Sequence, residues 1–175
     1  TLGFHNTAAA ASIGKTATKD ENGPQGLTAS LLGSDATQLT ATAFTSEDVM
    51  AATFNTDLMT EIGKVIGNNC LQADIACLYG PGNNIHRTPY GGRNFEYYSE
   101  DGVLGGNMAA NAILGAQEHG VYAYMKHFAL NDQETNRCGM LCTWANEQSI
   151  REIYLKPFEI AVKDGGCQAV MSSFN

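Results

Sequence analysis

The stretch that decides the fold is Ile75-Ala-Cys-Leu-Tyr-Gly-Pro-Gly82. Its first five residues form a short apolar run, which Gly-Pro-Gly stops at once. A short apolar run between turn signals is typical of a strand that is buried on both faces. Strands of that kind belong to parallel sheets, because helices cover both faces of such a sheet. The sequence therefore predicts a parallel strand over 75–79.

Two helical patterns precede this strand. A short helix is predicted over 46–53, with Ser46 as its N-cap and two acidic residues in its first turn, where the helix dipole favours anions. A second helix is predicted from about Asn55 to Asn68. Residues 1–45 are rich in Gly, Ala, Ser and Thr, and we expect a loop with short structured parts there. The apolar face expected for the second helix is Leu58, Met59, Ile62, Val65 and Ile66.

The alternation continues after the strand. We expect a helix that begins at Ser99 or Asp101 and runs to about Glu118. Its expected apolar stripe is Leu104, Met108, Ile113 and Leu114. The remaining predicted elements are a strand over 121–128, a helix from Asn146 that Pro157 restarts and Gly165-Gly166 ends, and a strand over 168–171.

Strands that alternate with helices, with long polar loops after the strands, indicate an α/β fold with a parallel sheet. We expect part of a (β/α)8 barrel, roughly its first half, because a whole barrel needs about 250 residues and this chain has 175. A partial barrel leaves strand edges unpaired, and open edges promote association. We therefore expect the isolated chain to self-associate, or to be ordered only beside the remainder of its own barrel or a complementing chain.

The composition excludes several classes of protein. Lys plus Arg number 10 and Asp plus Glu number 18, which gives a net charge of −8 and argues against nucleic acids and anionic membranes as partners. Hydrophobic residues make up 43% of the chain, enough for a packed core, so disorder is excluded. No apolar run approaches the roughly 18 residues that cross a bilayer. No signal peptide is visible, and we expect a cytoplasmic location.

The five cysteines are odd in number and irregular in spacing, so they do not form a closed disulfide framework. Free thiols are the preferred interpretation, and a bridge between Cys138 and Cys142 across a loop is left open. No Cys-x-x-Cys pair suggests zinc, and Gly80-Pro-Gly82 lacks the Gly-Lys-Ser/Thr ending of a phosphate loop. We expect neither a metal nor a cofactor.

Basic side chains follow the first two strands of the barrel pattern. Arg87 and Arg93 lie in the glycine-rich loop after the first strand, and Lys126-His127 ends the second. The carboxyl ends of the strands carry the active site in (β/α) barrels. Charged donors that are paired with carboxylates can clamp the hydroxyls of a sugar by directed hydrogen bonds. Donors of this kind at the ends of neighbouring strands are therefore suited to a ligand with many hydroxyls, such as a sugar.

Further segments follow one another in a fixed order. They are Asn22-Gly-Pro24, Gly80-Pro-Gly-Asn-Asn-Ile-His-Arg87, Gly92-Arg-Asn-Phe-Glu96 with Ser99-Glu-Asp101, Lys126-His-Phe-Ala-Leu-Asn-Asp-Gln-Glu134, Arg151-Glu-Ile-Tyr-Leu-Lys-Pro-Phe-Glu159 and Val170-Met-Ser-Ser-Phe-Asn175. In this order and spacing the chain resembles glycoside hydrolase family 3, the β-glucosidase and β-xylosidase family, from about Asp20 onward.

The resemblance implies roles for individual residues. Arg93, Lys126 and His127 stand where the family binds hydroxyls of the sugar at the cleavage site. Asn22 stands where the family usually has Asp, and we expect it to assist with a weaker grip, because an amide lacks the charge that strengthens a hydrogen bond. Phe174 replaces the usual Tyr. Both departures leave the preferred sugar open.

The resemblance also implies the reaction. The family hydrolyses terminal non-reducing β-linked sugars of oligosaccharides or of aryl and alkyl glycosides, with retention through a covalent glycosyl-enzyme intermediate. The family's nucleophile and acid/base residue lie beyond the position of Asn175, so residues 1–175 are expected to be an incomplete N-terminal catalytic barrel domain without catalytic residues. We interpret Glu96 and Glu134 as groups that orient Arg93 and Lys126, and we expect the isolated chain to be inactive.

Two other functions remain as alternatives: a non-catalytic carbohydrate-binding or scaffolding fragment, and a pseudoenzyme, which Asn22 and Phe174 suggest. Single residues are open as well. Trp144 fits a sugar subsite or a core equally, and Asp132 fits a substrate contact or a turn cap equally. His86 is interpreted as a structural hydrogen-bonding residue.

Overall fold

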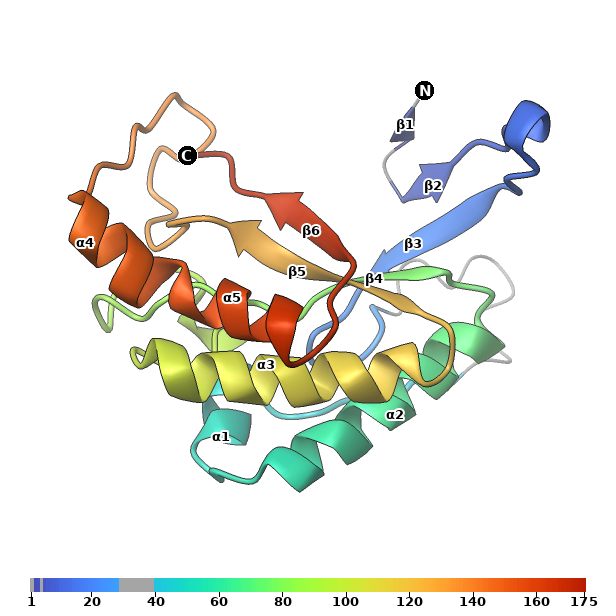
Figure 1. Ribbon diagram of the computed structural model, residues 1–175, viewed down its shortest axis with the longest axis horizontal. Coiled ribbons are helices and arrows are strands. Elements are labelled where there is room, and N and C mark those ends of the chain that lie inside the picture. The colour runs from blue at the N-terminus through green and yellow to red at the C-terminus, as the bar shows by residue number, and fades with distance from the viewer. Residues whose placement is uncertain (1, 4, 29–39) are drawn as a thin grey trace.

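A computed structural model describes residues 2–3, 5–28 and 40–175. Within these ranges, six strands form one sheet in the order β1-β2-β3-β4-β5-β6 (Figure 1). The first two, β1 (Leu2–Gly3) and β2 (Asn6–Thr7), are short and antiparallel. The other four are parallel: β3 (Thr18–Asn22), β4 (Cys77–Tyr79), β5 (Tyr122–Phe128) and β6 (Ala169–Ser172). The predicted parallel half-barrel is therefore confirmed, and its strands follow chain order.

The strand β3 was not predicted. Its sequence, Thr-Lys-Asp-Glu-Asn, has none of the apolar residues that mark a buried strand, and the pattern of residues 1–45 predicts a loop with short structured parts. The strand forms because it pairs with β4 in parallel register, Asp20 opposite Cys77 and Asn22 opposite Tyr79. Asp20 and Glu21 are buried in this arrangement. A polar strand in this position brings Asn22 to the same sheet edge as the ends of β4 and β5.

The predicted helix starts are confirmed by their caps. Asn55 accepts a hydrogen bond from the backbone N–H of Leu58 at the start of α2 (Thr56–Gln72). Asp101 accepts from two backbone N–H groups at the start of α3 (Gly102–Gln117). Asn146 caps α4 (Glu147–Ser149), which continues through a π-helical turn, η5 (Ile150–Tyr154), into α5 (Lys156–Lys163). The predicted short helix is α1 (Glu47–Ala51), although the Ser46 side chain makes no cap hydrogen bond.

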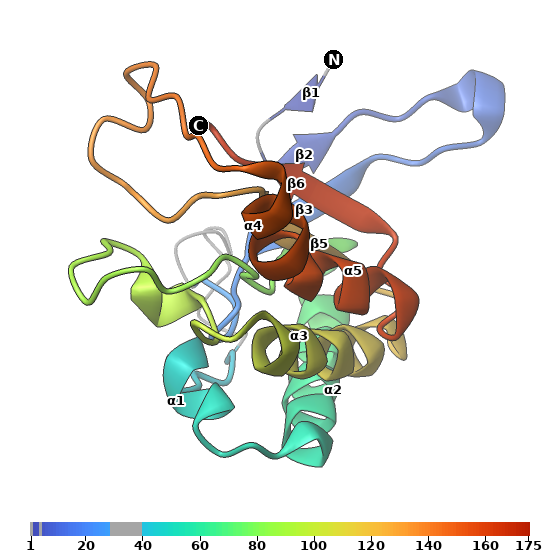
Figure 2. The same cartoon turned by 60° about the vertical axis from the view of Figure 1, so that its left-hand side comes forward.

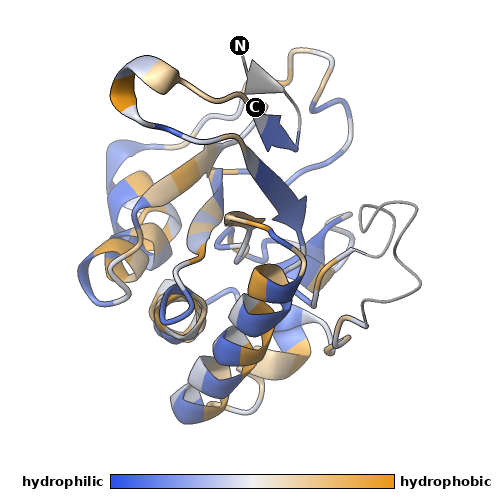
Figure 3. Cartoon of the chain, turned by 90° about the vertical axis from the view of Figure 1, so that its right-hand side faces the viewer, coloured by the Kyte–Doolittle hydropathy of each residue, from blue (hydrophilic) through white to orange (hydrophobic). Residues whose placement is uncertain are grey.

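Two details of the helix prediction are wrong. The helix α2 continues four residues past Asn68, and three residues assigned to apolar faces, Leu58, Val65 and Leu114, are exposed. The exposure of these three residues follows from how closely α2 and α3 pack. A Cβ on Gly63 would lie 2.2 Å from the carbonyl oxygen of Ala112, so the two backbones touch and the buried stripe is narrow. Figure 3 shows hydrophobic and hydrophilic residues on different sides of the long helices.

The core lies between the helices and the parallel strands. None of the helices in the described ranges is long and apolar enough to cross a bilayer. At the β6 end of the sheet, where no further strand pairs with β6 in the described residues, an apolar face remains open. This face surrounds a cavity of about 600 Å³. Its apolar residues are Met125, Phe128, Leu155, Phe158, Val162 and Val170.

We expect the isolated chain to associate through this apolar face. Replacing Val162 with Glu should shift the chain toward monomer, because association would then bury a carboxylate. Light scattering coupled to size-exclusion chromatography measures the change. The matched control is Val103→Glu, at an equally exposed valine of α3, which should leave association unchanged. A wild-type chain that is monomeric at tens of micromolar would contradict the expectation.

Candidate functional site

The four predicted site residues come from three neighbouring strands and their loops. Asn22 is the last residue of β3, and Lys126 and His127 lie near the end of β5. Arg93 lies in the loop after β4, directly before the short helix η4 (Asn94–Glu96). Figure 2 shows the loops after β4 and β5 on the same side of the sheet. The carboxyl ends of the parallel strands thus bring all four residues to one region.

A single carboxylate joins the two cations. Glu96 Oε1 accepts a hydrogen bond from Arg93 Nε, and Glu96 Oε2 lies 3.0 Å from Lys126 Nζ. The side chains of Lys126 and Glu96 are only 3% and 5% exposed. Burial lowers the pKa of Lys126, and the Glu96 carboxylate opposes that shift. The guanidinium and the ammonium therefore lie side by side, held by the two oxygens of Glu96.

Asn22 and Lys126 are in direct contact. Lys126 Nζ donates to Asn22 Oδ1 over 2.8 Å, while the backbone N–H of Asn22 donates to the Glu21 carboxylate. An ammonium group has three donors, and two of those of Lys126 are used by Asn22 and Glu96 among the described residues. Among the described residues, one N–H of Lys126 is therefore left without a hydrogen-bond partner.

Hydrogen bonds hold both ring nitrogens and the backbone of His127. Arg93 Nη2 donates to His127 Nε2 over 3.1 Å, and His127 Nδ1 lies 3.0 Å from the hydroxyl of Tyr97. Since Nε2 accepts, the neutral ring carries its proton on Nδ1. The Asn84 amide holds the backbone of His127 through two hydrogen bonds of 2.8 and 2.9 Å. Burial and the surrounding cations lower the pKa of His127 to about 2.

An outer layer of polar residues completes the cluster. Asn131 donates to the Tyr97 hydroxyl over 2.8 Å and to Glu134 over 3.0 Å. Glu134 lies 3.7 Å from Arg93 Nη1 and 2.6 Å from Arg137 Nε. Glu96 therefore holds both predicted cations, whereas Glu134 holds Arg93 and a second arginine.

Sequence reasoning did not single out Tyr97 or Asn84. Asn84 stands in the quoted Gly80–Arg87 segment and Asn131 in the quoted Lys126–Glu134 segment, so a search for polar residues just after strand ends would have found both. Tyr97 gives no such signal, because its neighbours Glu96 and Tyr98 are buried as well. Only the fold directs its hydroxyl to His127.

Other candidates lie outside the cluster. His86 Nε2 lies 2.9 and 2.7 Å from the backbone carbonyls of Asn94 and Tyr97, in agreement with its structural interpretation. Trp144 is 87% exposed, so a core role is wrong. Burial raises the pKa of Asp132 to about 6.

The described residues include all five cysteines, and each of them is a free thiol. Cys138 and Cys142 are free and exposed, so the bridge left open between them is not formed. No group of three or more His, Cys, Asp or Glu suited to a metal occurs in the part of the chain that the structure describes.

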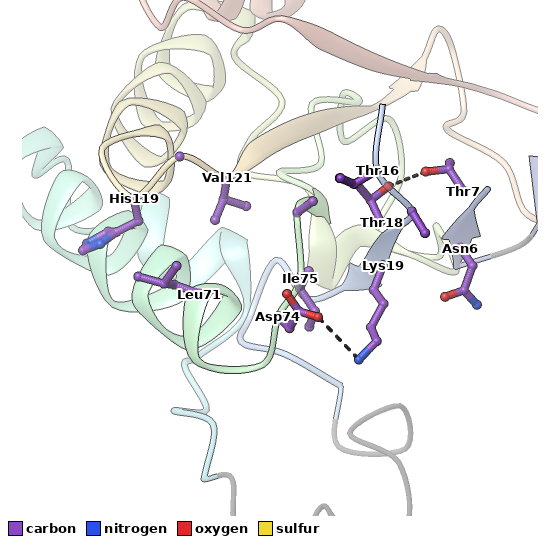
Figure 4. Close-up of a pocket in the computed structure, with 13 residues that line it drawn as sticks. Asn6, Thr7, Thr16, Thr18, Lys19, Leu71, Asp74, Ile75, His119 and Val121 are labelled. Atoms are coloured by element: carbon purple, nitrogen blue, oxygen red, sulfur yellow. Dashed lines mark hydrogen bonds and ion pairs between the residues drawn. The ribbon is translucent and has the colours of Figure 1, made fainter. Parts of the chain in front are cut away.

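A cavity of about 490 Å³ lies at the opposite, amino ends of the strands (Figure 4). Its lining includes Lys19, which pairs with Asp74 over 3.9 Å, and His119 on the far side of Leu71. None of the four predicted sugar-binding residues lines this cavity. It is separate from the cluster around Lys126.

We expect the His127 ring to stay neutral across the physiological range. The NMR signals of its imidazole should not move between pH 8 and pH 5, because its pKa is lowered to about 2. The unfolded chain would take up the proton first, near the ordinary pKa of about 6.5, so the domain should lose stability as the pH falls below that value. His127→Gln identifies the signal by its loss, and a titration midpoint near 6.5 would contradict the burial of the ring.

Residues 4–175 match the family described as Glycosyl hydrolase family 3 N terminal domain. A beta-glucosidase of Ruminococcus albus is 48% identical over 126 residues, which are 72% of this chain and 13% of that protein. An exo-alpha-(1->6)-L-arabinopyranosidase of Bifidobacterium longum is 37% identical over 159 residues, 88% of this chain and 21% of that protein. The structure of beta-glucosidase 3B from Thermotoga neapolitana in complex with glucose superimposes with a TM-score of 0.90 at 42% identity, over 97% of this chain and 24% of that one. The chain thus spans about a fifth or less of these two curated relatives.

Proposed function

The chain belongs to glycoside hydrolase family 3, in its N-terminal domain, and from this we propose that the protein that carries it is a β-glucosidase-type glycoside hydrolase. The observation that carries the proposal is the buried cluster in which Glu96 holds Arg93 and Lys126 side by side. The names of the similar proteins, most of which are beta-glucosidases, support a glucoside as substrate.

We infer that the cluster binds the terminal non-reducing sugar. Lys126 has one N–H left after its contacts with Asn22 and Glu96, and the Arg93 guanidinium is partly exposed. Both are charged donors, whose hydrogen bonds to hydroxyls are shorter and stronger than neutral ones. Asn22 contributes a neutral amide beside them. Oligosaccharides and aryl or alkyl glycosides would all present such a terminal sugar.

The proposed reaction retains the anomeric configuration through a covalent glycosyl-enzyme intermediate. It needs two carboxyl groups about 5–5.5 Å apart, one as nucleophile and one as proton donor. Glu96 and Glu134 are engaged by cations, so we assign them to positioning and assign the chemistry to residues outside 1–175. Arg93 and Lys126 would supply hydrogen bonds that strengthen as positive charge develops at the anomeric carbon. His127, whose two ring nitrogens are engaged by Arg93 and Tyr97, would contact the same sugar while it orients Arg93.

The full-length protein with p-nitrophenyl β-glucoside tests this function. Proton NMR of the first product should show β-glucose before mutarotation, as retention requires. Initial α-glucose would refute retention. Binding of glucose without any hydrolysis would favour the non-catalytic alternative, and the absence of both would overturn the saccharide assignment.

A further inference from the structure

Glu47 is a buried carboxyl group that the sugar cluster described above does not include. It lies in the first turn of α1, and its side chain is 0% exposed. Glutamate side chains are ordinarily exposed to water. In the first turn of a helix, the helix dipole also stabilises the charged carboxylate. Its complete burial therefore calls for a partner inside the protein.

That partner is the backbone next to Lys126. The N–H of Gly82 donates to Glu47 Oε1 over 3.2 Å. Gly82 pairs with Lys126 in a parallel bridge, with hydrogen bonds on either side: Lys126 N–H to the Pro81 carbonyl over 2.9 Å, and Asn83 N–H to the Lys126 carbonyl over 2.6 Å. Glu47 thus anchors the segment that holds the backbone of Lys126.

The contact between Glu47 and Gly82 also lies next to Glu96, the carboxylate partner of Lys126. A Cβ on Gly82 would lie 1.9 Å from the backbone oxygen of Glu96 and 3.0 Å from Glu47 Oε2. Gly82 therefore lies between Glu47 and the backbone of Glu96 with no space to spare. The helix α1 also packs against η4, which contains Glu96, and Figure 2 shows α1 beside the loop after β4. One side chain supports both members of the Glu96–Lys126 pair.

The charges around Glu47 suit a neutral group. It faces Glu96 from η4, Lys126 from β5 and the phenol of Tyr98. Burial raises the pKa of Glu47 well above its usual value, and the Glu96 charge adds to the shift, while the Gly82 N–H, Lys126 and Tyr98 oppose it. A protonated Glu47 can accept the Gly82 hydrogen bond without repelling Glu96 or competing with it for Lys126.

We propose that Glu47 is a positioning residue of the sugar site: by holding Gly82, it fixes the Glu96–Lys126 pair in the geometry that meets the substrate. The inference rests on the proposed function. Because Glu47 is fully buried, it acts not by contact with the sugar but through its hydrogen bond to Gly82, and not through charge. Glutamine should therefore replace it, whereas a side chain of similar volume without an acceptor should not.

Kinetics of the full-length protein on p-nitrophenyl β-glucoside test the proposal. Glu47→Gln should keep kcat/KM within about threefold, and Glu47→Met should lower it by about 10- to 100-fold, as expected for displaced binding groups. The loss should fall more on kcat than on KM, because the sugar hydrogen bonds tighten in the transition state. Asp48→Ala, at the exposed neighbour on the same helix, is the matched control and should match the wild type.

A readout that needs no substrate separates this inference from the function. Lys126 is buried, so an amine-reactive reagent, followed by mass spectrometry, should label it slowly in the wild type and in Glu47→Gln. In Glu47→Met, labelling of Lys126 should rise at least fivefold, while the exposed Lys163 is labelled equally in all variants.

If the wild type hydrolyses no glycoside, the proposed function fails, but the labelling still decides the role of Glu47. Protection of Lys126 that is unchanged in Glu47→Met would overturn the inference. A Glu47→Gln variant that loses protection would also overturn it, even where Glu47→Met does not fold, because the charge and not the hydrogen bond would then matter.

Discussion

Replacing Lys126 with Met should lower kcat/KM for p-nitrophenyl β-glucoside by about 10²- to 10³-fold in the full-length protein. Methionine keeps much of the length of lysine but lacks the ammonium group. In the wild type this group contacts Asn22 and Glu96 and has one N–H left for the sugar. A hydrogen bond to a charged group contributes about 1.5–3 kcal/mol, and each 1.4 kcal/mol is roughly a factor of ten. Loss of one such bond to substrate, with Glu96 left partly unpaired, gives the expected range.

Initial rates with purified variants measure this effect. Lys64→Met is the matched control, because Lys64, on the surface of α2, pairs with Glu61 and Glu118 and has no contact with the cluster. Its kcat/KM should equal that of the wild type. If Lys126→Met behaves like Lys64→Met, Lys126 does not bind the sugar.

Replacing Glu96 with Gln should destabilise the domain by about 3–5 kcal/mol, the usual cost of breaking a buried ion pair. Two cations depend on this carboxylate, and Lys126 is almost fully buried. An amide oxygen can accept hydrogen bonds, but the uncharged amide cannot balance two positive charges, and its NH2 group only donates. The expected result is a large drop in the urea concentration at which the domain unfolds.

Urea unfolding followed by the fluorescence of the full-length protein measures this change. The control is Glu61→Gln, which breaks a solvent-exposed pair with Lys64 on one turn of α2 and should change stability by less than about 1 kcal/mol. Equal unfolding midpoints for Glu96→Gln and Glu61→Gln would contradict the role of Glu96 as the centre of the cluster.

The elements that the sequence predicts are those in which local chemistry and burial agree. The apolar runs of β4 and β5 and the caps Asn55, Asp101 and Asn146 are local signals, and each appears in the structure where expected. Arg93 and Lys126 could be brought together in advance because parallel strands end at one edge of the sheet. Their shared contact with Glu96 follows from that arrangement.

What could not be predicted depends on contacts between distant segments. The polar strand β3 has no period of apolar residues and forms through its pairing with β4. Leu58 and Val65 fit an apolar face by spacing, but glycines bring α2 and α3 so close that neither is needed in the core. Glu47 has the sequence context of an exposed first-turn residue, and the packing of the Gly82 segment and of η4 against α1 makes it a buried one.

A crystal structure of the full-length protein with glucose tests the central claim most directly. Hydroxyl oxygens of a single glucose should lie within about 2.7–3.2 Å of Lys126 Nζ and of a guanidinium nitrogen of Arg93, with His127 and Asn22 in contact with the same ring. Glucose bound only elsewhere, for example in the cavity at the amino ends of the strands, with the Arg93–Glu96–Lys126 cluster free of sugar, would contradict the account.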